Sequence, residues 1–187
     1  MAEIELTAEK RTQRIVFFAI VALTALGLAA SAALLVDYLR PLPLFCSETS
    51  GCAKLRSTDY SHILGVPTPA IGLVGYFVMA SLTVAKGDVA RFLHLVAATF
   101  GALAAGIFLF LQFMMSPLCA YCLTVDITTI VLLTLVLLCV CTEADGPDGR
   151  GAIGVSASLA FAAVLPFLWN AAAKSGVPDV IAAEMKN

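Results

Sequence analysis

The chain has 187 residues, of which 60% are hydrophobic and only 13% are charged, and its formal net charge is −2. A soluble domain is typically about 45–50% apolar and about 25% charged, so this composition indicates an integral membrane protein. The near-neutral charge gives no indication of a nucleic-acid partner. The sequence contains no phosphate-binding loop, no G-x-G-x-x-G and no H-E-x-x-H, so nucleotide-binding and zinc-protease functions lack support.

Five apolar stretches approach the length of about 20 residues that a transmembrane helix needs. Pro67 and Pro69 precede the second stretch and suit a helix start, where the missing proline N–H costs little. The fifth stretch is the weakest and contains Pro166. The predicted spans cover residues 15–36, 67–85, 92–115, 118–141 and 152–173.

The first apolar stretch has some features of a secretion signal. Lys10, Arg11 and Arg14 precede it, and Ala30-Ser31-Ala32 resembles a cleavage site. The apolar region of a signal peptide is usually about 7–15 residues long, whereas this stretch remains apolar as far as Val36. We therefore expect an uncleaved transmembrane helix.

Basic residues in the short loops predict the orientation of the chain in a plasma (inner) membrane. The basic residues before the first stretch, together with Lys86 and Arg91, fall on one side, which the positive-inside rule places in the cytoplasm. The two segments expected in the cytoplasm are a solvated tail, 1–13, and a loop, 142–151. The segments expected on the periplasmic or equivalent outer side are the loop 37–66, the turn 116–121 and the tail 174–187.

The orientation places four of the six cysteines on the outer face, where disulfides form and persist: Cys46, Cys52, Cys119 and Cys122. The other two, Cys139 and Cys141, fall at the inner end of the fourth span. We expect these two to pack as small apolar side chains.

Cys119-Ala-Tyr-Cys122 stands where the fourth helix is predicted to begin, shortly after Pro117. In a first helical turn the side chains at i and i+3 are neighbours, so the two sulfurs could bond. Unpaired N–H groups and the helix dipole favour a thiolate there, and C-x-x-C thiols in such positions often have lowered pKa values. The pair is therefore a candidate for thiol–disulfide exchange, with an inert disulfide or a chance pair as the alternative.

Cys46 and Cys52 enclose a polar, glycine-containing segment, Ser-Glu-Thr-Ser-Gly. This pair could form a static disulfide or a mobile one that reaches another partner. A zinc site is not expected, because the x5 spacing exceeds the usual x2–4 and no histidine lies near the motif. Two pairs on one face indicate a relay, in which a mobile pair collects electrons and a fixed pair passes them to an acceptor in the bilayer.

The order of these features carries a family resemblance. A first transmembrane helix is followed by Cys46-x5-Cys52 with Gly51 before the second cysteine, then by Ser57-Thr58, by "LGVPTPAIGLVGY" and by "CAYCLT" opening a later helix. This arrangement resembles the vitamin K epoxide reductase family, specifically its bacterial homologues, over residues 14–141. The resemblance implies an all-α membrane protein with a four-helix transmembrane bundle around a quinone and an outer loop as a cap. The fifth transmembrane helix, 152–173, would be an addition to this bundle.

The resemblance also implies an activity and an order of electron transfer. Bacterial members reoxidise a thioredoxin-fold (DsbA-like) periplasmic thiol protein and pass its electrons to a quinone. Carried onto this sequence, Cys46 would meet the thiol of the partner, and Cys52 would exchange with Cys119. Cys122 would then be the thiolate next to the quinone. The sequence does not decide between ubiquinone, menaquinone and a vitamin K-like naphthoquinone.

Several residues are candidates for the quinone site. The family has a hydroxyl residue six positions after the second loop cysteine, which here is Thr58, with Ser57 beside it. The outer half of the third span is crowded with large apolar side chains. Those that could line a quinone pocket, or simply pack, are Phe108, Phe110, Phe113, Met114 and Met115.

Two features depart from the family pattern. Many bacterial members continue into a fused thioredoxin-like domain, and this sequence has no such C-x-x-C, so we expect the partner to be a separate protein unless the chain is a fragment. Asp126 follows Cys122 by one helical turn; it could relay a proton to the reduced quinone or lie near the membrane interface. We further expect residues 50–64 to form a short amphipathic helix with Leu55, Ile63 and Leu64 on its apolar face.

Two other functions compete with this one. A DsbB-type oxidase of separate ancestry would perform similar chemistry, but it normally places its C-x-x-C in the first outer loop. A non-enzymatic bundle with two static disulfides would perform no exchange.

Overall fold

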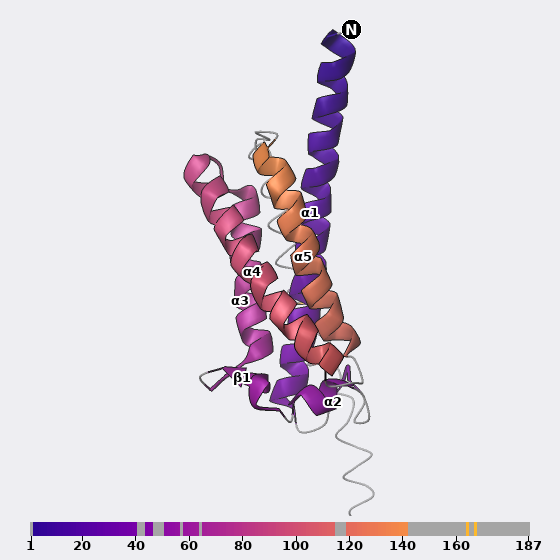
Figure 1. Cartoon of the computed structure of the whole chain (residues 1–187), viewed down its shortest axis with the longest axis vertical. Coiled ribbons are helices and arrows are strands. Elements are labelled where there is room, and N and C mark those ends of the chain that lie inside the picture. The colour runs from indigo at the N-terminus through magenta and orange to yellow at the C-terminus, as the bar shows by residue number, and fades with distance from the viewer. Residues whose placement is uncertain are drawn as a thin grey trace, which may run out of the picture.

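The computed structural model describes residues 2–40, 44–46, 51–56, 58–63, 65–114 and 119–141, together with positions 164 and 167. Four long helices run side by side in this part of the chain (Figure 1). They are α1 (Ala2–Leu39), α3 (Thr68–Val84), α4 (Asp88–Met114) and α5 (Ala120–Cys141). Helix α1 packs on α3 and α5, and α4 packs on α5 and α3, which closes a four-helix bundle.

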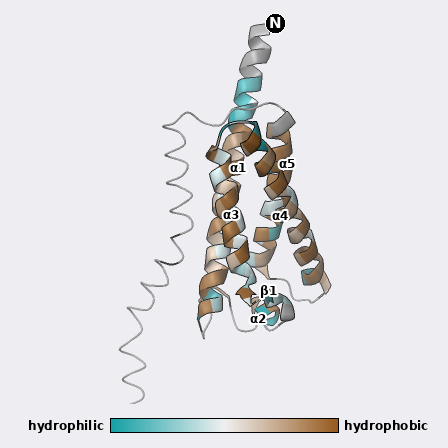
Figure 2. Ribbon diagram, turned by 90° about the vertical axis from the view of Figure 1, so that its left-hand side faces the viewer, coloured by the Kyte–Doolittle hydropathy of each residue, from teal (hydrophilic) through white to brown (hydrophobic). Residues whose placement is uncertain are grey.

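The helices have the length and composition of membrane spans. α1, α4 and α5 each contain a stretch long and apolar enough to cross a membrane, and α3 is a shorter apolar helix of 17 residues. Hydrophobic residues dominate the bundle, while hydrophilic ones gather on the first part of α1 and around α2 (Figure 2). The prediction of an all-α membrane protein is therefore confirmed. Apart from positions 164 and 167, the expected fifth span, 152–173, lies outside the described residues.

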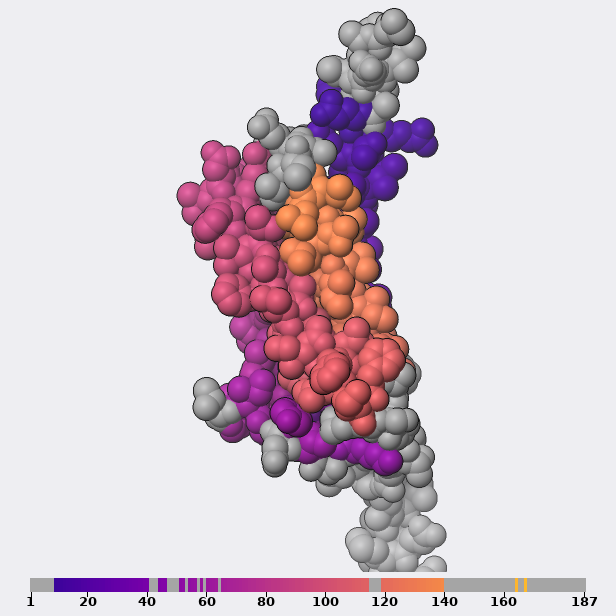
Figure 3. Space-filling model, viewed as in Figure 1, coloured from indigo at the N-terminus to yellow at the C-terminus, as the bar shows by residue number. Residues whose placement is uncertain are grey.

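Large apolar side chains cover the outside of the bundle. Val74 of α3 and Phe100 and Ile107 of α4 are all more than half exposed. Side chains of α4 and α5 lie in contact along the front of the molecule (Figure 3). A surface of this kind suits lipid, which leaves the packed interior to smaller and more polar side chains.

Helix α1 begins earlier than the sequence suggested. It starts at Ala2, so residues 2–13, expected as a solvated tail, continue the helix and project beyond the other helices (Figure 1). The segment is rich in Ala, Glu, Leu and Lys, which have high helix propensities, and this explains the extension.

One end of the bundle, here called the loop end, carries the short elements and the start of α5. These elements are α2 (Gly51–Arg56), a 3-10 turn (Asp59–Ser61), β1 (His62–Ile63) and β2 (Val66–Pro67). β1 and β2 pair antiparallel, with His62 opposite Pro67 and Ile63 opposite Val66. The prediction of one amphipathic helix over 50–64 was therefore wrong. Gly65 has φ of 82°, a turn conformation that favours a hairpin over a continued helix.

The bundle core brings side chains of all four long helices together. Tyr76 of α3 is 5% exposed and crosses to α5, where its hydroxyl meets Val125 O at 3.0 Å, Thr128 Oγ1 at 2.7 Å and Thr129 Oγ1 at 2.8 Å. Gly27 of α1 leaves the space for the Tyr76 ring. The core residues are Ile20, Leu28, Tyr76, Met79, Ala80, Ala98, Leu132 and Val136.

Candidate functional site

Asp37, near the end of α1, holds the first part of the loop. Its buried carboxylate accepts backbone N–H groups from Leu44 at 2.7 Å, from Phe45 at 3.0 and 3.1 Å, and from Cys46 at 2.8 Å. Hydrogen bonds to a charged acceptor are stronger than neutral ones, so this contact fixes the backbone of Cys46 against α1.

Arg56 ties α2 to the same helix end. Its guanidinium donates to the carbonyl oxygens of Asp37 at 3.1 Å, Tyr38 at 3.4 Å and Arg40 at 3.1 Å. It also lies 5.8 Å from the centre of the Tyr38 ring. These contacts satisfy carbonyls at the C-terminus of α1, where a cation is favourable. Asp37 thus places Cys46, and Arg56 places α2, which carries Cys52.

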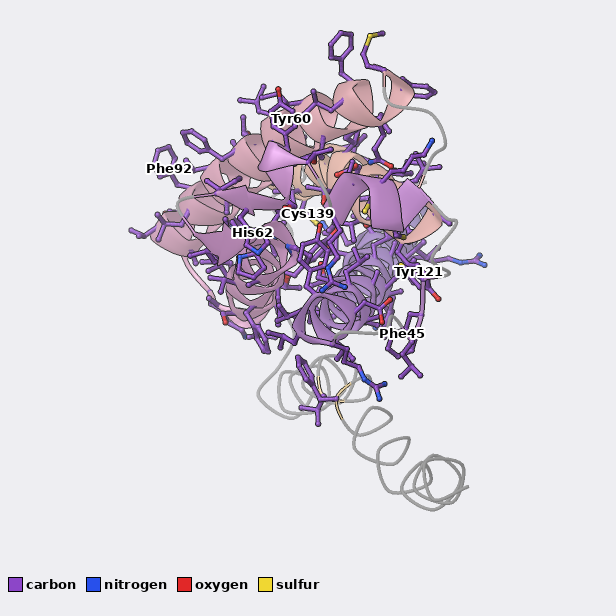
Figure 4. All side chains as sticks on the ribbon, turned by 90° about the horizontal axis from the view of Figure 1, so that it is seen from below. Phe45, Tyr60, His62, Phe92, Tyr121 and Cys139 are labelled. Carbon is purple, nitrogen blue, oxygen red and sulfur yellow. The ribbon has the colours of Figure 1, made fainter. Side chains whose placement is uncertain are left out.

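The cysteines of the loop and of α5 meet in one cluster. Cys46, Cys52 and Cys119 are buried together with Leu34 of α1, and Cys122 packs against this group. All four side chains are in the reduced, thiol form in this structure. The Phe45 and Tyr121 rings lie at one edge of the loop end, with centroids 6.5 Å apart in an edge-on arrangement (Figure 4). The structure therefore brings the four sequence-predicted cysteines together.

Cys119 is the hydrogen-bond acceptor of the cluster. The backbone N–H of Cys122 lies 3.3 Å from Cys119 Sγ, as expected for a sulfur beside the first turn of a helix. Hydrogen bonds from the thiols of Cys122, Cys46 and Cys52 lower the pKa of Cys119. The pKa of Cys46 is raised, chiefly because its thiol donates to Cys119. In this all-thiol state the contacts favour a thiolate at Cys119, whereas the sequence analysis expected one at Cys122.

A cavity of about 460 Å³ lies between the four long helices, next to this cluster. Small residues of facing helices leave the space, among them Gly72 and Gly75 of α3 and Ala104 and Ala105 of α4. Most of the wall is apolar, and the polar side chains in it are few. Cys122 lies in the wall, whereas Cys119 does not.

A polar pair lies in the cavity wall one helical turn from Cys122. Asp126 of α5 is buried, and Nε2 of Gln112 of α4 donates to its Oδ2 at 2.5 Å. Ser31 of α1, also buried, lines the same cavity. The site therefore joins a thiol cluster on one side of Cys122 to a cavity with few polar groups on the other.

Of the predicted quinone residues, Cys122 and Phe108 line the cavity, whereas the others that the structure describes lie elsewhere. Thr58 is half-buried and does not line the cavity; its hydroxyl donates to Leu55 O at 2.7 Å. Phe110, Phe113 and Met114 are more than 60% exposed and also lie outside the cavity wall. Ser57 lies outside the described residues.

Sequence reasoning missed several residues of the site. Tyr76 and Gln112 line the cavity, and the sequence predicted neither of them. Gln112 is an amide within an apolar helix, which is a signal for a functional position. Asp37 was considered only as the start of a loop, and nothing in the sequence shows which N–H groups it binds.

No group of three or more His, Cys, Asp or Glu side chains arranged for a metal was found in the described part of the chain. Comparison with protein families gave one match: residues 18–137, more than half of the chain, fit the vitamin K epoxide reductase family. Comparisons with curated proteins and with solved structures gave no match. The matched region contains both cysteine pairs and the four helices that surround the cavity, except for the ends of α1 and α5.

Proposed function

Because the chain belongs to the vitamin K epoxide reductase family, we propose that it is a thiol–quinone oxidoreductase that forms disulfide bonds in a thioredoxin-fold (DsbA-like) partner. Membership of this family indicates that the chain is a membrane thiol–disulfide oxidoreductase. The observation that carries the proposal is the position of the C-x-x-C pair. Cys119 packs against the loop cysteines, and Cys122 lines the cavity.

The first exchange takes place at the loop. A thiolate of the reduced partner attacks Cys46 of a Cys46–Cys52 disulfide, and the second thiol of the partner releases Cys46 from the mixed disulfide. The partner gains a disulfide, and both loop cysteines become thiols. Cys46 is 8% exposed here, so we expect the loop to open outward for this step.

The second exchange passes the electrons inward. The Cys52 thiolate attacks Cys119 of a Cys119–Cys122 disulfide, and Cys46 then attacks Cys52 to close the loop disulfide again. Cys119 and Cys122 end as thiols, having received two electrons. Because Cys46, Cys52 and Cys119 lie in one buried cluster, this exchange needs little movement.

The cavity fits a quinone head group. Its volume of about 460 Å³ falls within the roughly 300–1,000 Å³ of small-molecule sites, which are mostly apolar with a few placed polar groups. A bound quinone would accept two electrons and two protons and leave as a hydroquinone. Cys122 would stand next to it, and the Cys119–Cys122 disulfide would form as the electrons leave. Ubiquinone, menaquinone and a vitamin K-like naphthoquinone are all candidates.

The experiment measures oxidation of a reduced thioredoxin-fold protein by membranes that contain the chain and an added quinone. We expect the wild type to oxidise the donor and Cys119→Ser and Cys122→Ser to lose turnover. Cys139→Ser, the same change at the far end of α5, is the matched control and should remain active. Full turnover by Cys122→Ser would refute the mechanism.

A trapping experiment tests the order of the cysteines. In Cys52→Ser the loop has lost the thiol that would resolve a mixed disulfide at Cys46, so we expect a Cys46–partner adduct to accumulate on incubation with the oxidised partner, visible on non-reducing gels. A bundle with static disulfides would form no such adduct. Comparing ubiquinone with menaquinone in the turnover assay would then identify the acceptor.

A further inference from the structure

Asp126 and Gln112 form a polar pair that the thiol exchange does not use. Asp126 follows Cys122 by four residues and therefore lies one turn further along the same face of α5. Asp126 is 6% exposed and Gln112 is 2% exposed, and both line the cavity together with Cys122. Ionisable side chains within a membrane helix are costly and usually functional, so this buried carboxyl calls for a role.

One end of the Gln112 amide has no protein partner. Its Nε2 donates to Asp126, but within the described residues nothing donates to the buried Oε1. Ser31 Oγ, in the same cavity wall, is also buried without a partner there. Buried polar atoms normally have partners, so these two atoms are suited to polar groups of a molecule bound in the cavity. An amide oxygen accepts, and the matching group is therefore a hydroxyl.

Three tyrosines also line the cavity, Tyr38, Tyr60 and Tyr76, and a phenol is a weaker acid than a carboxyl. The Tyr76 hydroxyl lies within 3.0 Å of Val125 O and of the hydroxyls of Thr128 and Thr129. Its hydrogen and lone pairs are thus held by α5. Among the described residues that line the cavity, Asp126 is the one carboxyl, and it lies in the wall with Cys122.

We propose that Asp126 delivers a proton to a ring oxygen of the quinone and that Gln112 positions both Asp126 and the hydroxyl that results. This inference rests on the proposed function. After the transfer, the Asp126 carboxylate is held by Gln112 Nε2, as in this structure, and Gln112 Oε1 accepts from the new hydroxyl. Gln112 therefore binds the hydroquinone hydroxyl through Oε1 and stabilises the Asp126 carboxylate through Nε2 at the same time.

The step balances in bonds, electrons and protons. The S–S bond forms between the Cys119 thiolate, whose proton has already left, and Cys122, whose S–H bond breaks, and the two sulfurs release two electrons. Asp126 gives one proton to the near ring oxygen and regains one from the Cys122 thiol, one turn away. The Cys119 proton leaves to water at the loop end, and water supplies the proton for the second ring oxygen.

Asp126→Asn tests the proton transfer, because it keeps the shape and a hydrogen bond to Gln112 but removes the carboxyl proton. We expect kcat for quinone reduction to fall about 100-fold, the scale of a lost general acid. Asp126→Glu should recover part of the rate. Asp88→Asn, the same change at a fully exposed acid at the start of α4, is the matched control and should leave kcat unchanged.

Two readouts do not depend on turnover. Time-resolved infrared spectra on quinone reduction should show a transient loss of a protonated carboxyl band in the wild type, which recovers as Asp126 regains a proton, and no such change in Asp126→Asn. Exchange from the donor to the loop cysteines, followed without quinone, should be unchanged in Asp126→Asn, which shows an intact fold. Gln112→Leu should keep the carboxyl and weaken hydroquinone binding about tenfold, the scale of one lost hydrogen bond.

The outcomes separate the two proposals. A wild type that oxidises the donor with quinone, combined with wild-type kcat and an unchanged infrared spectrum in Asp126→Asn, would overturn this inference alone. A wild type that oxidises no donor with any quinone would overturn the proposed function. If Asp126→Asn also loses exchange at the loop cysteines and Asp126→Glu restores neither exchange nor kcat, Asp126 is structural and the inference fails.

Discussion

The sulfur of Cys119 is held by more donors than a buried thiol usually has. Hydrogen bonds from the thiol of Cys122, from the thiols of both loop cysteines and from the backbone N–H of Cys122 lower its pKa. The strongest of these contacts, from the Cys122 thiol, exists only when the pair is reduced. The low pKa of Cys119 is therefore a property of the reduced cluster, and it keeps this sulfur ready for exchange with Cys52.

We predict that Cys122→Ala raises the pKa of Cys119, because it removes the donor with the largest effect. Cys122→Ser is the matched control: its O–H can still donate, so the rise should be smaller. The measurement is the pH dependence of Cys119 alkylation in the reduced protein, located by mass spectrometry. Coincident profiles for wild type and Cys122→Ala would count against this account.

The same shift predicts a pH dependence of stability. The pKa of Cys119 is lower in the folded than in the unfolded chain. The thiolate therefore stabilises the reduced fold above the unfolded value, about 8.5, and this gain is lost as the pH falls through the folded value. In unfolding experiments on reduced Cys122→Ala, the free energy of unfolding should therefore rise less than in the wild type as the pH increases from the folded pKa of Cys119 to about 8.5.

At the scale of single residues, the sequence predicted the cysteines of the site better than the residues around them. Residue type and spacing singled out Cys46, Cys52, Cys119 and Cys122, which the structure brings into one cluster. Partners such as Gln112 and Asp126 are 14 residues apart on different helices, and their contact depends on how α4 and α5 pack. Phe110 and Phe113 were candidates by composition, but the rotation of α4 turns them away from the cavity.

At the scale of elements, α1 and α3 cross where Gly27 meets the ring of Tyr76. A Cβ at position 27 would lie 2.0 Å from Tyr76 Cζ, so the ring would have to move. The movement would also strain the hydrogen bonds of Tyr76 to α5, because one side chain links all three helices.

We predict that Gly27→Ala destabilises the bundle by about 1–3 kcal/mol, the usual cost of overpacking. Gly106→Ala in α4 is the matched control, since a Cβ there meets nothing within 4 Å and alanine favours a helix. Thermal unfolding in detergent checks both variants. If Gly27→Ala unfolds at the temperature of the wild type, the Tyr76 ring has another position open to it.

Apolar length explains which elements the sequence could predict. The expected spans 67–85, 92–115 and 118–141 differ from α3, α4 and α5 by a few residues, because long apolar runs determine membrane helices. The loop residues 50–64 lack such a run, and the contacts of Arg56 with the end of α1 determine where α2 lies. Residues 2–13 of α1 project beyond the other helices, so their helix, which begins at Ala2, is explained by helix propensity and not by packing.

At the scale of the whole molecule, the start of α5 separates two environments. On one side lie the loop and its thiols, held to α1 by Asp37 and Arg56. On the other side lies the cavity, whose wall reaches the lipid-facing residues Ile71 and Phe100 of α3 and α4. A water-soluble thiol protein and a lipid-soluble acceptor can therefore approach one C-x-x-C pair from different directions.

This separation predicts that the two half-reactions can be disabled independently. Ala105 of α4 is 4% exposed and lies in the cavity wall, away from the thiol cluster. Ala105→Leu should fill part of the cavity and raise KM for the quinone about tenfold or more, the effect of a clash worth roughly 1.4 kcal/mol. Exchange between the donor and the loop cysteines, measured without quinone, should keep its wild-type rate.

Ala85→Leu, an equal addition at an exposed position outside the cavity, should change neither value. A parallel loss of both half-reactions in Ala105→Leu, with an unchanged unfolding temperature, would mean that the cavity and the thiol cluster act as one site.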